Sequence, residues 1–141
     1  MPLLCRPLVL TNALAATVIE GPCPVQWTGR QAVVMLPEHI DVSNADQIRE
    51  LLLSVINRGA AALIIDMTAT ASCDHAGADA VAHAYQRAVA SGTQLRLVVT
   101  ARIVQRVLSI NGLDQLISIY PNLGAATAAG ALISGSLIRR Q

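Results

Sequence analysis

The chain has 141 residues, of which 53 % are hydrophobic and only 2 % aromatic, and its ten basic and nine acidic residues give a net charge of +1. A chain of this length forms one domain of ordinary size. The balanced charge and the lack of a basic stripe argue against nucleic-acid binding. The three cysteines show no CxxC or Cys/His spacing, which argues against a disulfide framework and fits a reducing cytoplasm.

The first 24 residues are expected to be an extension of the domain proper, because they end at the chain breaker Gly21–Pro24. The run LVLTNALAA within them is a poor match to a signal peptide, since only a single Arg6 and then Pro7 precede it and Asn12 interrupts it. No run reaches the roughly 18 apolar residues of a membrane span. We therefore expect a cytoplasmic protein without membrane insertion.

The following segment, residues 25–138, is predicted to form a single α/β domain. Its unbroken apolar run Leu63–Ile65 predicts a central strand buried on both faces. Alternating with helical periodicity, the strand signals call for one mixed sheet of four to five strands, covered by about four helices. In chain order we expect strands at 25–28 and 32–36, a helix between 43 and 59, a strand at 63–66, a helix at 76–91, a strand at 94–99, a helix at 103–110, a strand at 117–120 and a helix from 122.

The two longest predicted helices carry start and stop signals. Ser43, with Asp46 three residues later, resembles a capping box for the first helix, and Gly59 ends it. The carboxylate of Asp74 can accept hydrogen bonds from the first turn of the second helix, which ends at Gly92. We expect the second helix to bury Val81, Ala84, Tyr85, Ala88 and Val89.

Three segments occur in an order and at a spacing that resemble a known family. They are Glu38–Ala45, then Leu63–Asp66 followed by Asp74–Gly77, and finally Val107–Asp114 leading into Ile117–Tyr120. Together, over about residues 25–130, they are similar to the STAS domain of bacterial anti-sigma factor antagonists. The resemblance implies a protein that binds an anti-sigma factor, often also a serine kinase, and so releases a sigma factor.

The resemblance also implies a phosphorylation switch, and here the chain departs from the family pattern. In the family the kinase modifies a loop of the form Asp-Ser-Ser/Thr-Gly, and the added charge ends the interaction. In this chain the loop is Asp74–Gly77, and Ala76 occupies the phosphoacceptor-equivalent position, which cannot be phosphorylated. Asp41 matches the acidic residue of the family's Gly-Glu-Leu-Asp motif, whereas Glu38 replaces its glycine.

We therefore expect a partner-binding surface for a kinase-fold anti-sigma factor on a protein that is a monomer or a weak homodimer. Its expected residues are Asp41, Ser43, Asp74, His75, Ala76, Gly77 and Asp79. No set of nucleophile, base and orienting residue predicts an enzyme, and no cofactor or metal motif is present. Asp66, at a strand end, is expected to orient the loop that follows.

Several alternatives stay open at this stage. Cys73, beside the loop and near a helix N-terminus, is either an oxidant-sensing thiol or an inert buried residue. His75 is expected to be a surface residue rather than a catalytic base. Ser72 is the nearest hydroxyl that could replace the missing one. For the function, an adaptor subunit of a transporter and a scaffold in a signalling assembly are the alternatives.

Overall fold

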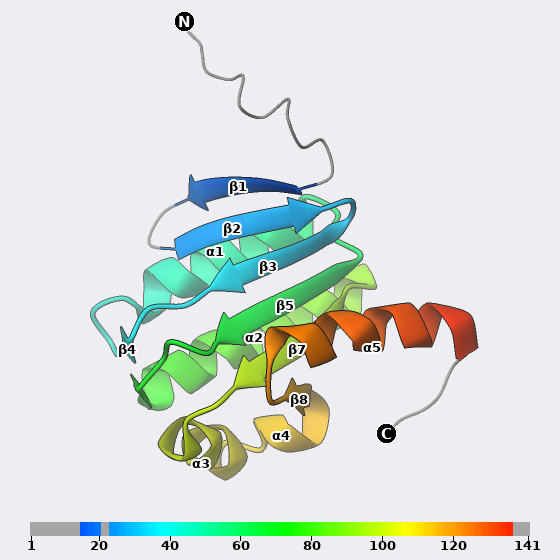
Figure 1. The fold of residues 1–141 in the computed structure, drawn as a ribbon. Coiled ribbons are helices and arrows are strands. Elements are labelled where there is room, and N and C mark those ends of the chain that lie inside the picture. The colour runs from blue at the N-terminus through cyan, green and yellow to red at the C-terminus, as the bar shows by residue number, and fades with distance from the viewer. Residues whose placement is uncertain (1–14, 21–22, 137–141) are drawn as a thin grey trace, which may run out of the picture.

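A six-stranded mixed sheet is the centre of the fold in a computed structural model, which describes residues 15–20 and 23–136. Its first three strands are antiparallel neighbours, and the remaining pairs are parallel. In spatial order the strands are β1 (Ala15–Glu20), β2 (Cys23–Thr28), β3 (Gln31–Met35), β5 (Ala62–Met67), β7 (Gln94–Val99) and β8 (Ser118–Tyr120). The predicted α/β class and mixed sheet are confirmed (Figure 1).

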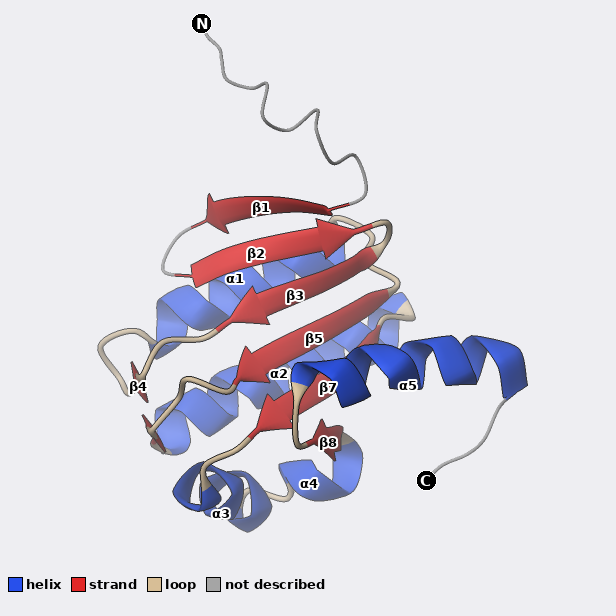
Figure 2. Ribbon diagram, in the orientation of Figure 1, coloured by secondary structure: helices blue, strands red, loops and turns tan. Residues whose placement is uncertain are grey.

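Helices lie on both faces of this sheet (Figure 2). Helices α1 (Ala45–Asn57) and α2 (His75–Ser91) lie side by side on one face, and α5 (Leu123–Ser136) crosses β5, β7 and β8 on the other. Helices α3 (Arg102–Ile110) and α4 (Leu113–Leu116) lie at the β8 edge of the sheet. Two helices on one face and one on the other leave the two cores very unequal in size.

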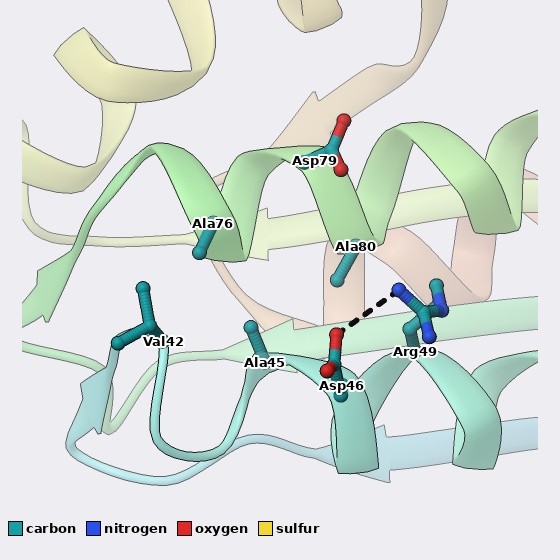
Figure 3. Close-up of a pocket in the computed structure, with 7 residues that line it drawn as sticks. All are labelled: Val42, Ala45, Asp46, Arg49, Ala76, Asp79 and Ala80. Atoms are coloured by element: carbon teal, nitrogen blue, oxygen red, sulfur yellow. Dashed lines mark hydrogen bonds and ion pairs between the residues drawn. The ribbon is translucent and has the colours of Figure 1, made fainter.

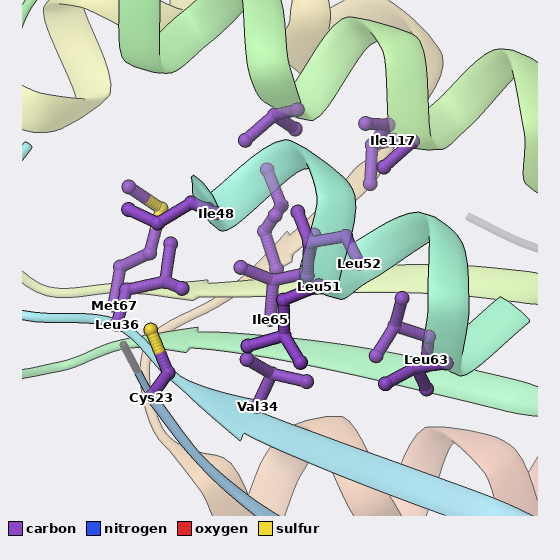
Figure 4. Packing of buried hydrophobic residues seen from close by; sticks show 14 of the residues in the cluster. Cys23, Val34, Leu36, Ile48, Leu51, Leu52, Leu63, Ile65, Met67 and Ile117 are labelled. Carbon is purple, nitrogen blue, oxygen red and sulfur yellow. The ribbon is translucent and has the colours of Figure 1, made fainter. Parts of the chain in front are cut away.

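The larger core lies between the sheet and the pair α1 and α2 (Figure 4). Leu63 and Ile65 of β5 point into it and meet residues such as Ile48 and Leu52 of α1. The smaller core, beneath α5, is built from Val33, Ile64, Val98 and Ala126. All six residues of β5 are buried. Because successive strand residues point to opposite faces, both faces of this strand are covered, which confirms the predicted central strand.

Three strands and one helix were not predicted from the sequence. Strand β1 pairs with β2 from Ala15 opposite Thr28 to Glu20 opposite Cys23, so the segment expected to be an extension supplies a strand of the sheet. Strands β4 (His39–Ile40) and β6 (Ser72–Cys73) form a separate two-stranded parallel sheet. These two are only two residues long and α4 only four, which is too short for hydrophobic periodicity to show.

The helix ends agree with the sequence in part. The Asp74 carboxylate caps α2 by accepting from the N–H of Gly77 at 3.1 Å, and Gly92 ends that helix with a φ of 77°, as expected. The predicted capping box at Ser43 is wrong, because α1 begins one residue later, after Asn44, with no side-chain cap.

The predicted burial of Val89 is also wrong, since this side chain is 62 % exposed. Val89 lies eight residues after Val81, which places it about 80° around the helix axis from it. That rotation carries Val89 to the edge of the stripe that faces the sheet. The other predicted positions on α2 are buried or half-buried.

Candidate partner-docking site

The two turns expected to form the site are joined by the β4 and β6 ladder. His39 pairs with Ser72 and Ile40 with Cys73, and the His39 Nδ1 and Ser72 Oγ atoms lie 2.7 Å apart. The N–H of Asp74 donates to the carbonyl of Ile40 at 3.1 Å. The turn before α1 and the start of α2 are therefore held as one unit, although they are more than thirty residues apart in the sequence.

Asp41 organises the first of these turns. Its Oδ1 accepts from the N–H of Ser43 at 2.8 Å and from the Ser43 hydroxyl at 2.5 Å. These two bonds, the hydroxyl first, hold the pKa of the Asp41 carboxyl below its ordinary value. The same bonds explain why Ser43 does not cap α1, since its hydroxyl is already directed at Asp41. The turn presents a charged, fully exposed carboxylate at neutral pH.

The Ser43→Ala variant is expected to raise the pKa of Asp41 toward its ordinary value, because it removes the largest cause of the shift. Because the pKa of Asp41 is lower in the folded state, the two bonds stabilise the turn at pH values above the pKa of the unfolded chain. This stabilisation is lost as the pH falls through the pKa of the folded state. A carboxyl-carbon NMR titration measures the change. Ser54→Ala is the matched control, because the Ser54 hydroxyl donates to the Leu51 carbonyl instead. An unchanged Asp41 pKa in Ser43→Ala would contradict this account.

The second turn is tied to the end of α3. The Asn111 Nδ2 atom lies 3.1 Å from the His75 Nδ1 atom and also donates to the carbonyl of Val107 at 2.8 Å. An amide nitrogen only donates, so in this arrangement Nδ1 of His75 accepts and Nε2 carries the proton. Asn111 was not among the expected site residues, although it lies in the third segment that carries the family resemblance.

Gly77 and Cys73 form the tight contact beneath this turn. A Cβ atom on Gly77 would lie 2.6 Å from the Cys73 Sγ and 2.6 Å from the Ile40 Cγ2, so only glycine fits there. Cys73 is 6 % exposed, and its burial, followed by the nearby Asp74, raises the pKa of its thiol to about 11. Because such a thiol is protonated at neutral pH, the structure gives no support to an oxidant-sensing Cys73.

A groove of about 260 Å³ lies between the first turns of α1 and α2 (Figure 3). Alanine side chains from both helices face it, and Val42 at its end is 77 % exposed. Asp46 and Arg49 form an ion pair at 3.0 Å along one side. The residues that line the groove are Val42, Ala45, Asp46, Arg49, Ala76, Asp79 and Ala80. The groove offers small and apolar contacts with carboxylates beside them and holds no nucleophile.

The structure brings the expected site residues to one end of the molecule, with one exception in role. Asp41 and Ser43 are exposed, as are Asp74, His75 and Asp79, whereas Gly77 is buried beneath the loop. Ser72 is half-buried and bonded to His39. Five residues of the groove were not among the expected site residues, and their only sequence signal is their position beside the starts of α1 and α2: Val42, Ala45, Asp46, Arg49 and Ala80.

Asp66 holds the loop that leaves β5, as expected. Its Oδ1 accepts from the N–H of Thr68 at 2.9 Å and also from the Thr68 hydroxyl. Within the described residues, no three His, Cys, Asp or Glu side chains lie together as metal ligands would. In the same part of the chain, no helix combines the length and apolar character needed to cross a bilayer.

The profile of the STAS domain family matches residues 24–126. The chain belongs to the STAS domain family. This assignment covers the sheet from β2 onward, both turns of the docking site and the start of α5. No curated protein sequence matches the chain.

Solved structures share the fold of this STAS domain. An anti-sigma factor antagonist from Mycobacterium paratuberculosis is 23 % identical, with a TM-score of 0.69, covering 82 % of this chain and 92 % of the other. An RsbS variant from Moorella thermoacetica is 22 % identical, with a TM-score of 0.72 and coverages of 81 % and 98 %. A sulfate transporter family protein from Wolinella succinogenes is 18 % identical, with a TM-score of 0.65 and coverages of 77 % and 90 %. At these identities the likeness establishes the fold alone.

Proposed function

We propose that this STAS domain is a non-enzymatic anti-sigma factor antagonist, which binds a kinase-fold anti-sigma factor in the cytoplasm and so releases a sigma factor. The supporting observation is the ladder between β4 and β6. It places the Asp41 turn, the Asp74–Gly77 loop and the groove between α1 and α2 on one exposed surface. The protein acts as a monomer or a weak homodimer and uses no cofactor.

The chemistry of this surface fits protein binding better than catalysis. Its carboxylates at Asp41, Asp46 and Asp79 are exposed, and exposed carboxylates at an interface can pair with basic side chains of a partner, as Asp46 already does with Arg49. The alanines of the groove allow a partner backbone or an aliphatic side chain to approach closely. A binding surface needs this combination of small apolar floor and charged rim.

The proposed antagonist lacks the family's phosphorylation switch. Ala76 is the second residue of α2, is half-buried and faces the groove. A phosphate at this position would lie beside Asp79 and Asp46, where like charges and a desolvated interface oppose it. With alanine there, the complex with the anti-sigma factor persists in the presence of ATP.

The Ala76→Ser variant is expected to gain a phosphate when it is incubated with its anti-sigma partner and ATP, whereas the wild-type 72–79 segment gains none. The partner is first recovered by affinity capture from native cells and identified by mass spectrometry. Phosphosite mapping by mass spectrometry then reads the result. Ala80→Ser is the matched control, because Ala80 lines the same groove one turn further along α2 and should stay unmodified.

Phosphate on the wild-type 72–79 segment, whose only hydroxyl is that of Ser72, would contradict the proposal of a missing switch. An Ala76→Ser variant that binds a kinase and stays unphosphorylated would count against the position of the site and leave the family assignment intact.

A second candidate function is an adaptor subunit of a transporter. It is supported by the structural likeness to the sulfate transporter family protein from Wolinella succinogenes. The same affinity capture separates the two, because an adaptor co-purifies with an integral membrane protein and an antagonist with a sigma regulator. A scaffold in a signalling assembly would instead run at high mass in light scattering.

A further inference from the structure

Helices α3 and α4 expose apolar side chains away from the proposed docking site. Ile103 is 59 % exposed, Ile110 67 % and Leu116 55 %. Exposed residues of this size on neighbouring elements mark an interaction surface more often than scattered single ones do. Positions 104 and 108 of α3 face the core, so the helix is anchored on one side and presents its other side to solvent.

A groove of about 590 Å³ runs along the exposed side of α3. Arg102, Arg106 and Ile110 line it from α3, Asp114 from α4 and Ile119 from β8. The first four of these residues are spaced by four in the sequence. On α3 this spacing sets Arg102, Arg106 and Ile110 at intervals of about one turn, whereas Asp114 comes from α4, beyond the break in the helix at Gly112.

The two arginines of this groove are unpaired within the described part of the chain. Neither Arg102 nor Arg106 makes a hydrogen bond or ion pair there, whereas Arg49 pairs with Asp46 and Arg30 bonds the Gly59 carbonyl. Two guanidinium groups one helical turn apart repel each other weakly when nothing neutralises them. A pair of carboxylates at the same spacing would satisfy both, and would do so with bidentate geometry.

We propose that the groove of α3, α4 and β8 binds an acidic amphipathic helix of a protein partner. The occupant presents two carboxylates four residues apart to Arg102 and Arg106, an aliphatic side chain to Ile110 and Ile119, and a basic residue to Asp114. Asp114 repels a third carboxylate, so it fixes the direction in which the helix lies. Amphipathic helices commonly bind by laying one face into a groove of this kind. This groove shares no lining residue with the groove between α1 and α2, although Asn111 at the end of α3 bonds His75, and the inference does not depend on the proposed function.

The probe is a synthetic helical peptide of 16 residues, with two Glu, a Leu and a Lys at successive intervals of about one turn. In an amide NMR titration of the full chain, the shifts are expected to concentrate on residues 102–119. Arg106→Glu is expected to weaken binding at least about tenfold, as an affinity loss of about 1.4 kcal/mol would. Arg87→Glu, at an exposed arginine of α2 outside the groove, is the matched control and should change affinity less than about twofold.

A charge-swapped peptide, with Lys at the two Glu positions, is expected to bind the double variant Arg102→Glu and Arg106→Glu and not the wild type. Shifts centred on α1 and α2, or equal losses in Arg106→Glu and Arg87→Glu, would overturn the proposal. The same shifts produced by inorganic phosphate would overturn it in favour of a small anion. Binding to phosphatidylserine vesicles without binding to the peptide would overturn it in favour of a lipid surface.

Discussion

Replacing Gly77 with alanine is expected to lower the free energy of unfolding by about 1–3 kcal/mol, because the added methyl group overpacks a buried contact. Its Cβ would lie 2.6 Å from both the Cys73 Sγ and the Ile40 Cγ2. The helix propensity of alanine favours the variant by at most about 1 kcal/mol and offsets the strain in part. Chemical denaturation monitored by circular dichroism measures the difference.

Gly124→Ala is the matched control for this variant, since it also places a methyl group on a helical glycine. There the nearest atom is the Asn122 Oδ1 at 3.3 Å, so the effect should be small. In a double variant, Cys73→Ala removes one of the two clashing atoms and should restore part of the stability lost in Gly77→Ala. A Gly77→Ala variant as stable as the wild type would contradict the tight contact of Gly77 with Cys73 and Ile40.

The Arg96→Met variant is expected to raise the free energy of unfolding by about 1–2 kcal/mol, because it removes a buried charge that no described carboxylate balances. Arg96 is 4 % exposed, on the face of β7 that α5 covers. Its Nη1 donates to the Ala126 carbonyl at 3.1 Å and its Nη2 to the Gln94 Oε1 at 2.5 Å, while its Nε has no partner among the described residues.

The direction of this effect follows from the pKa. Burial lowers the pKa of Arg96, and the nearby Tyr120 opposes that shift only in part. A cation whose pKa is lower in the folded state is disfavoured there while it is charged, so it weakens the fold at neutral pH. Arg87→Met, at an exposed arginine, should change stability by less than about 0.5 kcal/mol. A less stable Arg96→Met would show that the bond to Ala126 outweighs the buried charge.

The elements that could be predicted from the sequence are those with a long hydrophobic pattern. The apolar run of β5, the helical stripe of α1 and the glycine that ends α2 each depend on local chemistry, and each was found. The position of the Asp74–Gly77 loop followed from the family resemblance. Its cap by Asp74 followed from the residue type alone.

The parts that could not be predicted depend on contacts between distant residues. The ladder between β4 and β6 pairs His39 with Ser72, 33 residues later in the sequence, so no local pattern indicates it. The bond between Asn111 and His75 depends on where α3 ends in space. The Ser43 hydroxyl donates to Asp41 and so does not cap α1. The capping-box spacing between Ser43 and Asp46 carries no information about this competing bond. The state of the Cys73 thiol likewise depends on burial rather than on its place near a helix N-terminus.

The ladder between β4 and β6 bears on the kinetics of the proposed partner binding. Two backbone N–H groups, of Ala71 and Ser72, donate to the Glu38 carbonyl at 2.7 and 3.2 Å, in addition to the pairs of the ladder itself. A binding loop fixed in this way loses little conformational entropy when it meets a partner. For the proposed partner we therefore expect association as the encounter of two rigid bodies, at rates on the order of 10⁵–10⁷ M⁻¹s⁻¹ that diffusion and orientation set. Differences in affinity among partners would lie in how slowly each complex dissociates.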